Sequence, residues 1–315
     1  MRVLVLGGYG AVGARVVAEL RRRGDEPIVA GRDPQRAERV VDLADPAALR
    51  AAAAGAEVVV NAAGHEDPAI AQEVTDAGAA FVDVTATTAY VAALQRLRPR
   101  RPILASVGLA PGLTNLLAAA AHAAAPGPVE IAVLLGAGER HGAAATAWSY
   151  RLLGRRFADA SGGPVRNYSR PRRFDLPGHG RRRLYRTDFS DQHVLTRDLG
   201  APVRTYFGLD STLATTALAG LTWLPGAAHA PRGLHFPGGD GWVALARTAA
   251  GGLRWATGRG QSQATAVIAA AAAHIAAGLP PGVHHLHQVT TLADLPAHQH
   301  ILLGGSCGTT SSSSA

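Results

Sequence analysis

Hydrophobic residues in the first 125 positions form short unbroken runs that alternate with longer amphipathic stretches. An unbroken apolar run is typical of a parallel strand buried on both faces, and helical periodicity marks an amphipathic helix. The runs predicted as strands are Val3–Leu6, Pro27–Ala30, Val40–Leu43, Glu57–Asn61, Ala80–Val84 and Ile103–Val107. The stretches predicted as helices are Ala11–Arg23, Pro34–Arg39 (a helix start), Pro46–Ala54, Pro68–Ala77 and Ala89–Leu97. This alternation predicts an α/β fold with a Rossmann-type, doubly wound parallel sheet.

The pattern changes after a Pro-Gly-Pro segment at residues 126–128. Beyond it the strand candidates are grouped, which predicts a mixed or antiparallel sheet in a second, α+β domain. A chain of 315 residues can hold two modest domains, or one domain with a large insertion. The later elements predicted are a strand and a helix within 129–150, a helix at Ser211–Leu224, strands at Leu234–Phe236, Trp242–Thr248 and Leu253–Thr257, and a long helix at Gln263–Gly278.

A glycine-rich turn joins the first strand to the first helix, which is the context that a dinucleotide-binding GxGxxG motif needs. Gly8 permits the tight turn, Gly10 lets a pyrophosphate approach the backbone, and Gly13 lets the helix pack on the strand. The helix N-terminus offers unpaired N–H groups to that anion. A glycine turn that binds nothing is the alternative. The residues predicted to line the cofactor here are Gly8, Tyr9, Gly10, Ala11, Val12 and Gly13.

The end of the second strand predicts which dinucleotide binds. Chains that bind NAD usually place an acid there to accept hydrogen bonds from the ribose 2′-hydroxyl. This chain has Gly31 followed by Arg32 and Asp33, and a guanidinium binds a 2′-phosphate that a carboxylate would repel. Arg36 could assist. The alternative is that Arg32 is a solvated charge and Asp33 a helix cap. We predict NADP as the cofactor, with Arg32 and Asp33 among the residues that bind it.

Composition excludes several classes of chemistry. The chain contains no lysine, so all 31 basic residues are arginine. This excludes a Schiff-base lysine, a Walker-type phosphate loop and the Tyr-x-x-x-Lys pair of ordinary short-chain dehydrogenases. Cys307 is the sole cysteine, so disulfides, thiolate catalysis and cysteine–zinc sites are not expected.

Charge and hydropathy bear on partners and location. A net charge of +8 would suit nucleic acid, but aromatic residues make up only 5% and no recognition module is present. We therefore expect no nucleic-acid partner. The alanine-rich runs are too short to span a bilayer, and the first residues already form a strand rather than a signal peptide. We expect a cytoplasmic protein with no membrane partner.

Several segments together resemble the saccharopine dehydrogenase-like family of NADP-binding oxidoreductases. They are GGYGAVG, AGRDP, FVDVTA, GLAPGLTNLLA at Gly108–Ala118, and the late GRGQSQATAVIAAA followed by PPGVHHLHQ. The first 120 residues carry most of the resemblance, and the middle third matches loosely. The glycine- and serine-rich tail at 304–315 is expected to be disordered. The resemblance implies a discontinuous Rossmann domain at 1–125 and 259–300 and an inserted substrate and dimerisation domain at 126–258. It also implies NADPH-dependent hydride transfer to a small-molecule imine formed from an amine and a carbonyl compound.

Ligands of doubly wound sheets bind beyond the carboxyl ends of the strands. That rule selects Asp42, which could accept from the adenine amine or cap the next helix. It also selects Asp83, which the family resemblance makes a catalytic candidate, with helix capping as the alternative. Asn115 in the turn PGLTN is expected to pin the turn through backbone hydrogen bonds. The further cofactor-binding residues predicted at this edge are Ala62, Ala63, Gly64 and Thr85.

The second domain offers candidates for catalysis and substrate binding. His141 lies on a glycine-rich turn after a strand and could donate a proton near neutral pH, with Glu139 orienting it. Trp148 could wall the nicotinamide pocket or belong to the core. The arginines between 151 and 186 could include a clamp for a substrate carboxylate. The histidines at 284, 285 and 287 lack partners at ligand spacing, so no metal is expected.

Three functions stay open at this point. The first is imine reduction. The second is reduction of a polarised C=C or C=O bond in a biosynthetic pathway, and the third is non-catalytic sensing of NADP(H). A homodimer is also expected.

Overall fold

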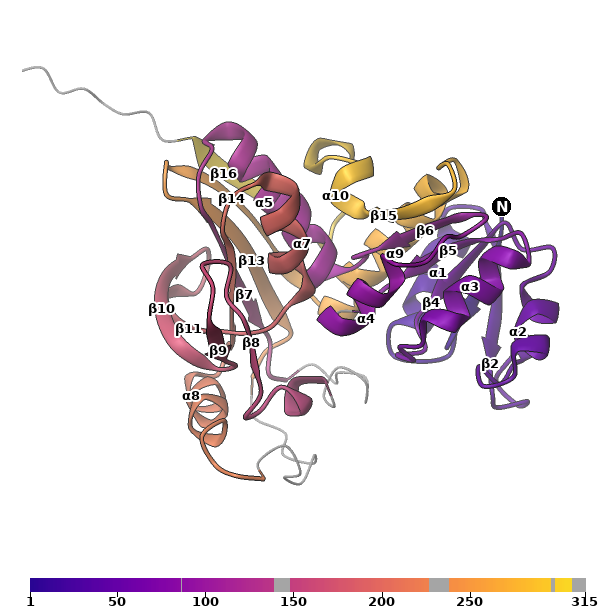
Figure 1. Cartoon of the computed structure of the whole chain (residues 1–315), viewed down its shortest axis with the longest axis horizontal. Coiled ribbons are helices and arrows are strands. Elements are labelled where there is room, and N and C mark those ends of the chain that lie inside the picture. Colours follow the sequence, from indigo (N-terminus) through magenta and orange to yellow (C-terminus); the bar gives the residue numbers. More distant parts are fainter. Residues whose placement is uncertain (86, 139–147, 227–237, 296–297, 308–315) are drawn as a thin grey trace, which may run out of the picture.

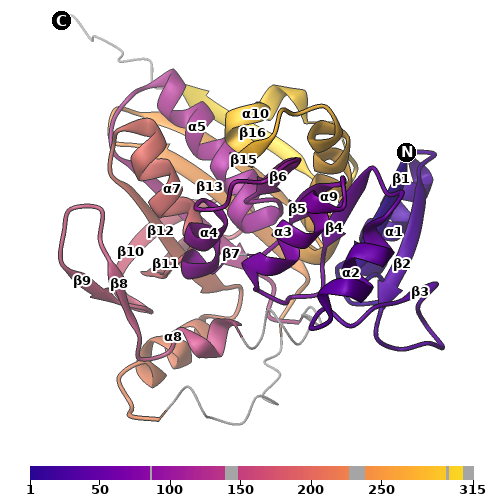
Figure 2. The same cartoon turned by 45° about the vertical axis from the view of Figure 1, so that its right-hand side comes forward.

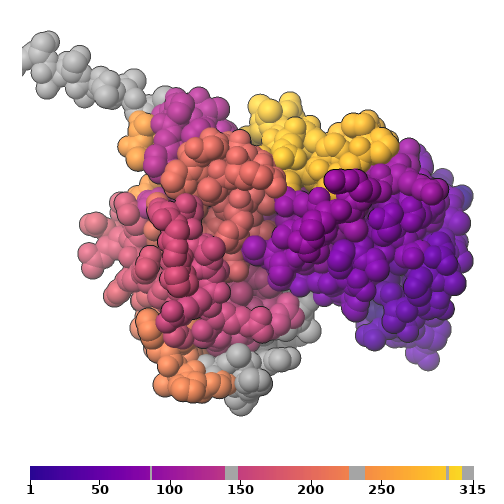
Figure 3. Space-filling view, in the orientation of Figure 1, coloured from indigo at the N-terminus to yellow at the C-terminus, as the bar shows by residue number. Residues whose placement is uncertain are grey.

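The computed structural model describes residues 1–85, 87–138, 148–226, 238–295 and 298–307. Two lobes, each built on a seven-stranded sheet, lie side by side along the long axis of the molecule (Figure 1). In the space-filling view, the purple surface of the first lobe abuts the pink and salmon surface of the second (Figure 3). The described residues contain no helix that is both long enough and apolar enough to span a bilayer.

The sheet of the first lobe, sheet A, is parallel throughout, with strand order β15-β6-β5-β4-β1-β2-β3. This confirms the predicted doubly wound sheet. Its central strands are fully buried, which is why they appear in the sequence as unbroken apolar runs. The strands are β1 (Arg2–Leu6), β2 (Glu26–Gly31), β3 (Arg39–Val40), β4 (Val58–Asn61), β5 (Ala80–Asp83), β6 (Pro102–Ala105) and β15 (Gly282–His285).

Helices cover both faces of sheet A because successive side chains of each strand point to opposite faces. Val3 and Val5 face one apolar cluster, which α1 and α9 complete, whereas Leu4 and Leu6 face another, completed by α2, α3 and α4. Late in the sequence, α9 and β15 return to lie beside the early strands (Figure 2). The helices are α1 (Gly13–Arg22), α2 (Pro46–Ala53), α3 (Pro68–Asp76), α4 (Thr88–Leu94) and α9 (Gln261–Ala277).

The second lobe has a mixed sheet, sheet B, in the order β10-β11-β12-β7-β13-β14-β16. Only β12 and β7 pair in parallel; the other neighbours are antiparallel. Helices α5 (Thr114–Ala124) and α7 (Ser190–Leu199) pack on one face. The strands are β7 (Val129–Leu135), β10 (Ser169–Leu176), β11 (Gly180–Arg186), β12 (Val203–Leu209), β13 (Gly241–Thr248), β14 (Gly252–Arg259) and β16 (Leu302–Cys307).

The arginine-rich hairpin β10–β11, at one edge of sheet B, curls over the opposite face of the strands β7 and β13. The Arg247 guanidinium of β13 lies 4.3 Å from the centre of the Phe174 ring of β10, and Arg172 pairs with Glu130 of β7 at 2.8 Å. Beside this hairpin lie the short pair β8 (Arg156–Ala158) and β9 (Pro164–Arg166), and α8 (Thr212–Leu221). The short elements η1 (Leu109–Leu113), α10 (Leu286–Val289) and η3 (Leu292–Asp294) complete the described chain.

Three sequence predictions differ from the structure. Residues 34–36 form a turn rather than a helix start, and the third strand is Arg39–Val40 rather than Val40–Leu43. The first part of the predicted disordered tail, residues 304–307, belongs to β16, which pairs with β14. A Cβ on Gly304 would lie 2.2 Å from the Trp255 ring, so the glycines that suggested flexibility instead allow close packing. The predicted strand Leu234–Phe236 lies outside the described residues.

Candidate cofactor site and domain seam

The turn after β1 is closely packed against the neighbouring backbone. Gly7 has φ of 71°, a conformation that favours glycine, so the left-handed residue precedes Gly8. A Cβ on Gly8 would lie 2.9 Å from the Val5 carbonyl oxygen, and one on Gly13 would lie 2.1 Å from the Gly7 carbonyl oxygen. Gly13 therefore lets the start of α1 meet the turn, as the motif predicts.

The same turn presents hydrogen-bond donors to an anion. Within the described residues, no carbonyl accepts from the backbone N–H groups of Ala11 and Val12, which directly precede α1. Such N–H groups, at the positive end of a helix, are suited to a phosphate group. A Cβ on Gly10 would reach 3.1 Å from the Gly7 carbonyl oxygen, so this residue also keeps the turn compact. The residues present thus fit the pyrophosphate of a dinucleotide.

Arg32 is exposed at the end of β2 and makes no hydrogen bond or ion pair within the described part of the chain. Its neighbours are engaged with Tyr9. The Asp33 N–H donates to the Tyr9 hydroxyl at 3.1 Å, and Arg36 donates to the Tyr9 carbonyl at 2.9 Å with its guanidinium 4.4 Å from the ring centre. A Cβ on Gly31 would lie 2.4 Å from the Tyr9 ring, so Tyr9 occupies the space of a side chain at that position.

Two carboxylates near this edge hold local turns. Asp33 accepts from the Gln35 N–H at 3.0 Å, which holds a turn rather than a helix. Asp42 is exposed and accepts from the Ala44 N–H at 3.1 Å. The N-cap of α2 is Asp45, so the alternative in which Asp42 caps that helix is wrong. Asp45 is the cap because its carboxylate accepts hydrogen bonds from the N–H groups of the first helical turn.

Asp83, at the end of β5, is buried and accepts from four donors. One oxygen accepts from Asn61 Nδ2 at 2.9 Å and from the Tyr90 hydroxyl at 2.8 Å. The other accepts from the Thr85 N–H at 2.7 Å and from the Thr85 hydroxyl. Burial raises the pKa of Asp83, and the four donors oppose that rise. This arrangement joins the ends of β4 and β5 to Tyr90 of α4. The N-cap of α4 is Thr87, so Asp83 does not cap that helix, and its catalytic role stays a prediction.

Ala62, Ala63 and Gly64 follow β4 at the same edge. Asn61 Oδ1 accepts from the Ala63 N–H at 3.2 Å, and Ala63 and Gly64 are exposed. Ala63 also lies against Gly7, where a Cβ would come within 2.7 Å of the Ala63 Cα. The loop after β4 therefore borders the glycine turn, as the carboxyl-end rule predicts.

The turn after β6 is buried and hydrogen-bonded from within. Asn115 Oδ1 accepts from the Gly112 N–H at 2.9 Å, so Asn115 pins this turn as predicted. Asn115 Nδ2 is buried without a partner among the described residues. Ser106, with φ of 57°, bonds to His285 Nδ1 at 2.9 Å, and burial lowers the pKa of His285 to about 4. This histidine is therefore neutral at physiological pH.

The two lobes meet at a domain seam, formed by α4 and η1 of the first lobe and α7 of the second. His193 Nε2 lies 2.7 Å from Asp188 Oδ1, and the same oxygen accepts from the Thr88 hydroxyl at 2.9 Å. Thr88 begins α4, and His193 lies in the first turn of α7. No sequence pattern predicted this group; the only available signal was a carboxylate just before a helix and a histidine in its first turn.

Comparisons with known proteins found one matching family model and several similar solved structures. Residues 3–114 match the model of the NAD dependent epimerase/dehydratase family. Saccharopine dehydrogenase (L-Glu forming) from Saccharomyces cerevisiae is similar over 91% of this chain and 94% of its own, with a TM-score of 0.56 and 12% identity. This chain has the saccharopine dehydrogenase fold. DAP dehydrogenase from C. glutamicum, in complex with DAP, is similar over 92% of this chain and 94% of its own, with a TM-score of 0.53 and 14% identity. A search of curated proteins gives no match.

Within the saccharopine dehydrogenase fold, the other predicted site residues have different positions. His141 and Glu139 lie outside the described residues. Trp148 is half-buried, and its ring centre lies 4.8 Å from that of Phe189 at the rim of the main core. Most arginines of the predicted carboxylate clamp lie on the hairpin β10–β11, away from sheet A. The described residues contain no cluster of histidine, cysteine, aspartate or glutamate suited to a metal ion.

Proposed function

We propose that this protein is an NADPH-dependent oxidoreductase that transfers hydride to a small-molecule imine formed from an amine and a carbonyl compound. Residues 1–125 and 259–300 bind the dinucleotide in this proposal, and residues 126–258 supply the substrate side. When bound, NADPH supplies the hydride, whereas the protein binds, orients and excludes water. The observation that carries the proposal is the combination of a glycine turn with unpaired N–H donors and an arginine without a protein partner beside it.

The choice of NADP rests on the end of β2. Arg32 has no protein partner in the described chain, so its guanidinium is available to a 2′-phosphate. Tyr9 fills the space that an acidic side chain at position 31 would need, which disfavours the usual NAD arrangement. Arg36 is held close by through its contacts with Tyr9 and adds positive charge.

The imine as substrate is supported by likeness of fold. Saccharopine dehydrogenase (L-Glu forming) and the DAP dehydrogenase that binds DAP both share the two-lobed architecture over more than nine-tenths of their chains. His141 and Glu139 stay predictions for proton transfer on the substrate side, as does Trp148 for the wall of the nicotinamide pocket. The homodimer also stays a prediction.

Two measurements on the full chain test the proposal. First, NADPH and NADH are titrated separately, with binding followed by cofactor fluorescence. We expect NADPH to bind at least tenfold more tightly, because a charge-assisted bond to the 2′-phosphate contributes about 1.5–3 kcal/mol. Second, NADPH oxidation is followed with amines mixed with α-keto acids and aldehydes, and separately with unsaturated acids and with carbonyl compounds alone. We expect turnover only where an amine and a carbonyl compound are both present.

The outcomes separate the three functions. Turnover with unsaturated acids, or with carbonyl compounds in the absence of amine, would replace imine reduction with reduction of a C=C or C=O bond. Tight NADPH binding with no turnover in any mixture would favour an NADP(H) sensor. Equal affinity for NADPH and NADH would overturn the cofactor assignment.

A further inference from the structure

The domain seam contains a histidine whose two ring nitrogens have different surroundings. His193 Nε2 bonds to Asp188 Oδ1 at 2.7 Å, whereas Nδ1 has no hydrogen-bond partner in the described part of the chain. The side chain is 29% exposed. A carboxylate accepts hydrogen bonds but does not donate them, so Asp188 places a proton on Nε2. Nδ1 is therefore the ring nitrogen left open to exchange a proton with a ligand.

Asp188 is itself held from the opposite lobe. Its Oδ1 accepts from the Thr88 hydroxyl at 2.9 Å, and its backbone N–H donates to Asn167 Oδ1 at 2.7 Å. Thr88 begins α4 five residues after the last residue of β5, which places it at the carboxyl edge of sheet A. Ligands of doubly wound sheets bind at this edge. His193 thus sits where the second lobe meets the edge that the cofactor would occupy.

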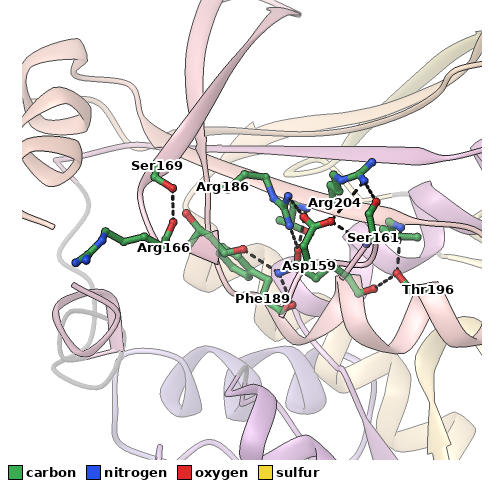
Figure 4. Close-up of polar contacts among 12 residues, drawn as sticks. Asp159, Ser161, Arg166, Ser169, Arg186, Phe189, Thr196 and Arg204 are labelled. Carbon is green, nitrogen blue, oxygen red and sulfur yellow. Dashed lines mark hydrogen bonds and ion pairs between the residues drawn. The ribbon is translucent and has the colours of Figure 1, made fainter. Parts of the chain in front are cut away.

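The residues before His193 fix the start of α7. Asp191, fully buried, accepts from the Thr114 and Thr205 hydroxyls at 2.9 and 2.7 Å. Gln192 accepts from Arg186 at 3.0 Å and donates to the Thr187 carbonyl at 3.0 Å. Figure 4 shows the adjoining network, in which Arg186 and Arg204 converge on Asp159. A backbone held on both sides leaves His193 little freedom to leave Asp188.

Two carboxylates interact electrostatically with His193. They are Asp188, whose Oδ1 bonds to Nε2, and the buried Asp191. The Thr88 hydroxyl of α4 bonds to the same Asp188 oxygen, and the Phe157 ring of β8 lies 6.3 Å from the imidazole centre; neither group carries a charge. The imidazole therefore has one acidic partner that orients it and a second acid close by. This pattern, a base oriented by a carboxylate, is the one used for proton transfer in enzymes.

We propose that His193 is the proton donor for imine formation at this site, with Asp188 and Thr88 as positioning residues. The proposal rests on the proposed function. The amine adds to the carbonyl carbon to give a carbinolamine. The Nδ1–H of the His193 imidazolium then donates its proton to the carbinolamine hydroxyl, the C–O bond breaks, water leaves, and the nitrogen lone pair forms the C=N bond. Overall, amine, carbonyl compound, NADPH and one proton give the secondary amine, NADP⁺ and water.

The structure provides a matched control at the opposite edge of sheet A. His274 Nε2 lies 2.8 Å from Asp25 Oδ2, and its side chain is 45% exposed, so it resembles His193 in partner and access. Asp25 lies just before β2, which places this pair at the amino edge of the sheet, away from ligands. A reagent that modifies exposed histidines should therefore reach both residues in the free protein.

The first arm of the test needs no substrate. The full chain is treated with diethyl pyrocarbonate, with and without saturating NADP⁺, and carbethoxylation of each histidine is followed by peptide mass spectrometry. We expect bound NADP⁺ to slow modification of His193 at least fivefold and to leave His274 unchanged. If NADP⁺ binds and the His193 rate does not change, His193 does not line the cofactor cleft and the proposal is wrong.

The second arm uses the amine–carbonyl mixture that turns over fastest. We expect His193→Gln to lower kcat about a hundredfold and to remove the alkaline limb of the pH–rate profile, because the donated proton comes from this imidazole. Asp188→Asn should lower kcat about tenfold and shift that limb, and Thr88→Val should do so more weakly. His274→Gln is the control and should change neither. A preformed cyclic imine of an amino acid needs no dehydration step, so His193→Gln should reduce it at nearly the wild-type rate.

The outcomes distinguish this inference from the proposed function. If no mixture turns over in the wild type, the proposed function fails, and the proton donor fails with it. If the wild type turns over and folded His193→Gln keeps both its kcat and its pH limb, only the inference fails. If His193→Gln does not fold, Asp188→Asn decides, because an unchanged pH limb in that variant contradicts the positioning role. Equal losses with the mixture and with the cyclic imine would also contradict a role in dehydration.

Discussion

The two edges of sheet A use the same kinds of groups in opposite ways. At the amino edge, Asp25 bonds to the Met1 amine at 3.3 Å and to His274 at 2.8 Å. Glu19, also buried, pairs with Arg22 and Arg23. At the carboxyl edge, by contrast, Arg32 has no partner among the described residues, and neither has the buried Asn115 Nδ2. The buried charged groups at the amino edge pair within the protein, whereas at the carboxyl edge an exposed cation and a buried amide nitrogen have no partner in the described chain.

This difference separates stability from binding. A buried polar group without a partner costs free energy unless a ligand or water completes its hydrogen bonds. Groups paired within the protein, such as Asp25 and Glu19, need no ligand. The carboxyl edge is therefore the edge at which a bound molecule would complete the structure, in agreement with the rule for doubly wound sheets. Substitutions that remove either a group paired within the protein or a group open to a ligand test this difference between the edges.

The largest expected effect concerns Asp83, a carboxyl-edge group that the structure satisfies from within. An Asn at this position has an NH₂ group in place of one acceptor oxygen. That NH₂ would face either Asn61 Nδ2 or the Thr85 N–H, which are both donors, and the Thr85 N–H cannot become an acceptor. We expect Asp83→Asn to lower the free energy of unfolding by about 3 kcal/mol, measured by urea denaturation, because it leaves buried donors without an acceptor. A variant of wild-type stability with abolished turnover would instead make Asp83 catalytic.

The next effect concerns the glycine turn. A Cβ on Gly13 would lie 2.1 Å from the Gly7 carbonyl oxygen, which is backbone and cannot move without opening the turn. We expect Gly13→Ala to lower the free energy of unfolding by about 2 kcal/mol and to weaken NADPH binding more than tenfold. Gly220→Ala is the control, because Gly220 is exposed at the end of α8 with no atom within 4 Å of the added Cβ. That change should stabilise the protein by up to about 1 kcal/mol. Similar behaviour of the two variants would contradict the packing role of Gly13.

The sequence predicted the central strands of sheet A well because they are buried on both faces. The runs around Val58–Asn61 and Ala80–Asp83 leave almost no other interpretation, and the predicted ends lie within one residue of the observed ones. Sheet B was harder. In β10 and β11 the core residues Phe174, Leu176 and Leu184 are surrounded by arginines, which hid the alternation of a strand.

The candidate site divides along the same line. The glycine turn and Arg32 lie on one continuous βαβ unit, so a local motif predicts them. His193, Asp188 and Thr88 come from two lobes, with 100 residues separating Thr88 from Asp188. No local pattern reports such a contact, because it depends on how the second lobe packs against α4. Sequence reasoning favoured His141 for the same task, on the strength of its glycine-rich surroundings.

The third prediction tests the open arginine. We expect Arg32→Ala to weaken NADPH binding about tenfold to a hundredfold and to leave NADH binding unchanged, because only NADPH carries the 2′-phosphate. Arg98→Ala is a matched control, since Arg98 is also exposed but precedes β6 at the amino edge. It should change neither affinity. If both variants weaken NADPH binding equally, the protein attracts NADPH through its net positive charge rather than through a contact at the end of β2.

The smallest effect is expected at the amino edge. The hydrogen bond from Arg22 lowers the pKa of Glu19, so folding favours its carboxylate form. The stabilisation is therefore present above the unfolded pKa of about 4.3 and is lost as the pH falls through the lower folded pKa. We expect Glu19→Gln to cost about 1 kcal/mol or less near neutral pH, since Arg22 is largely exposed. Urea denaturation at stepped pH should show that the difference in stability from wild type shrinks in acid.

The control is Glu26→Gln, because Glu26 is an exposed acid without a pair in the described chain. This variant should show no such difference. A change in NADPH affinity with Glu19→Gln would contradict the separation of the two edges, because this pair should contribute to folding alone.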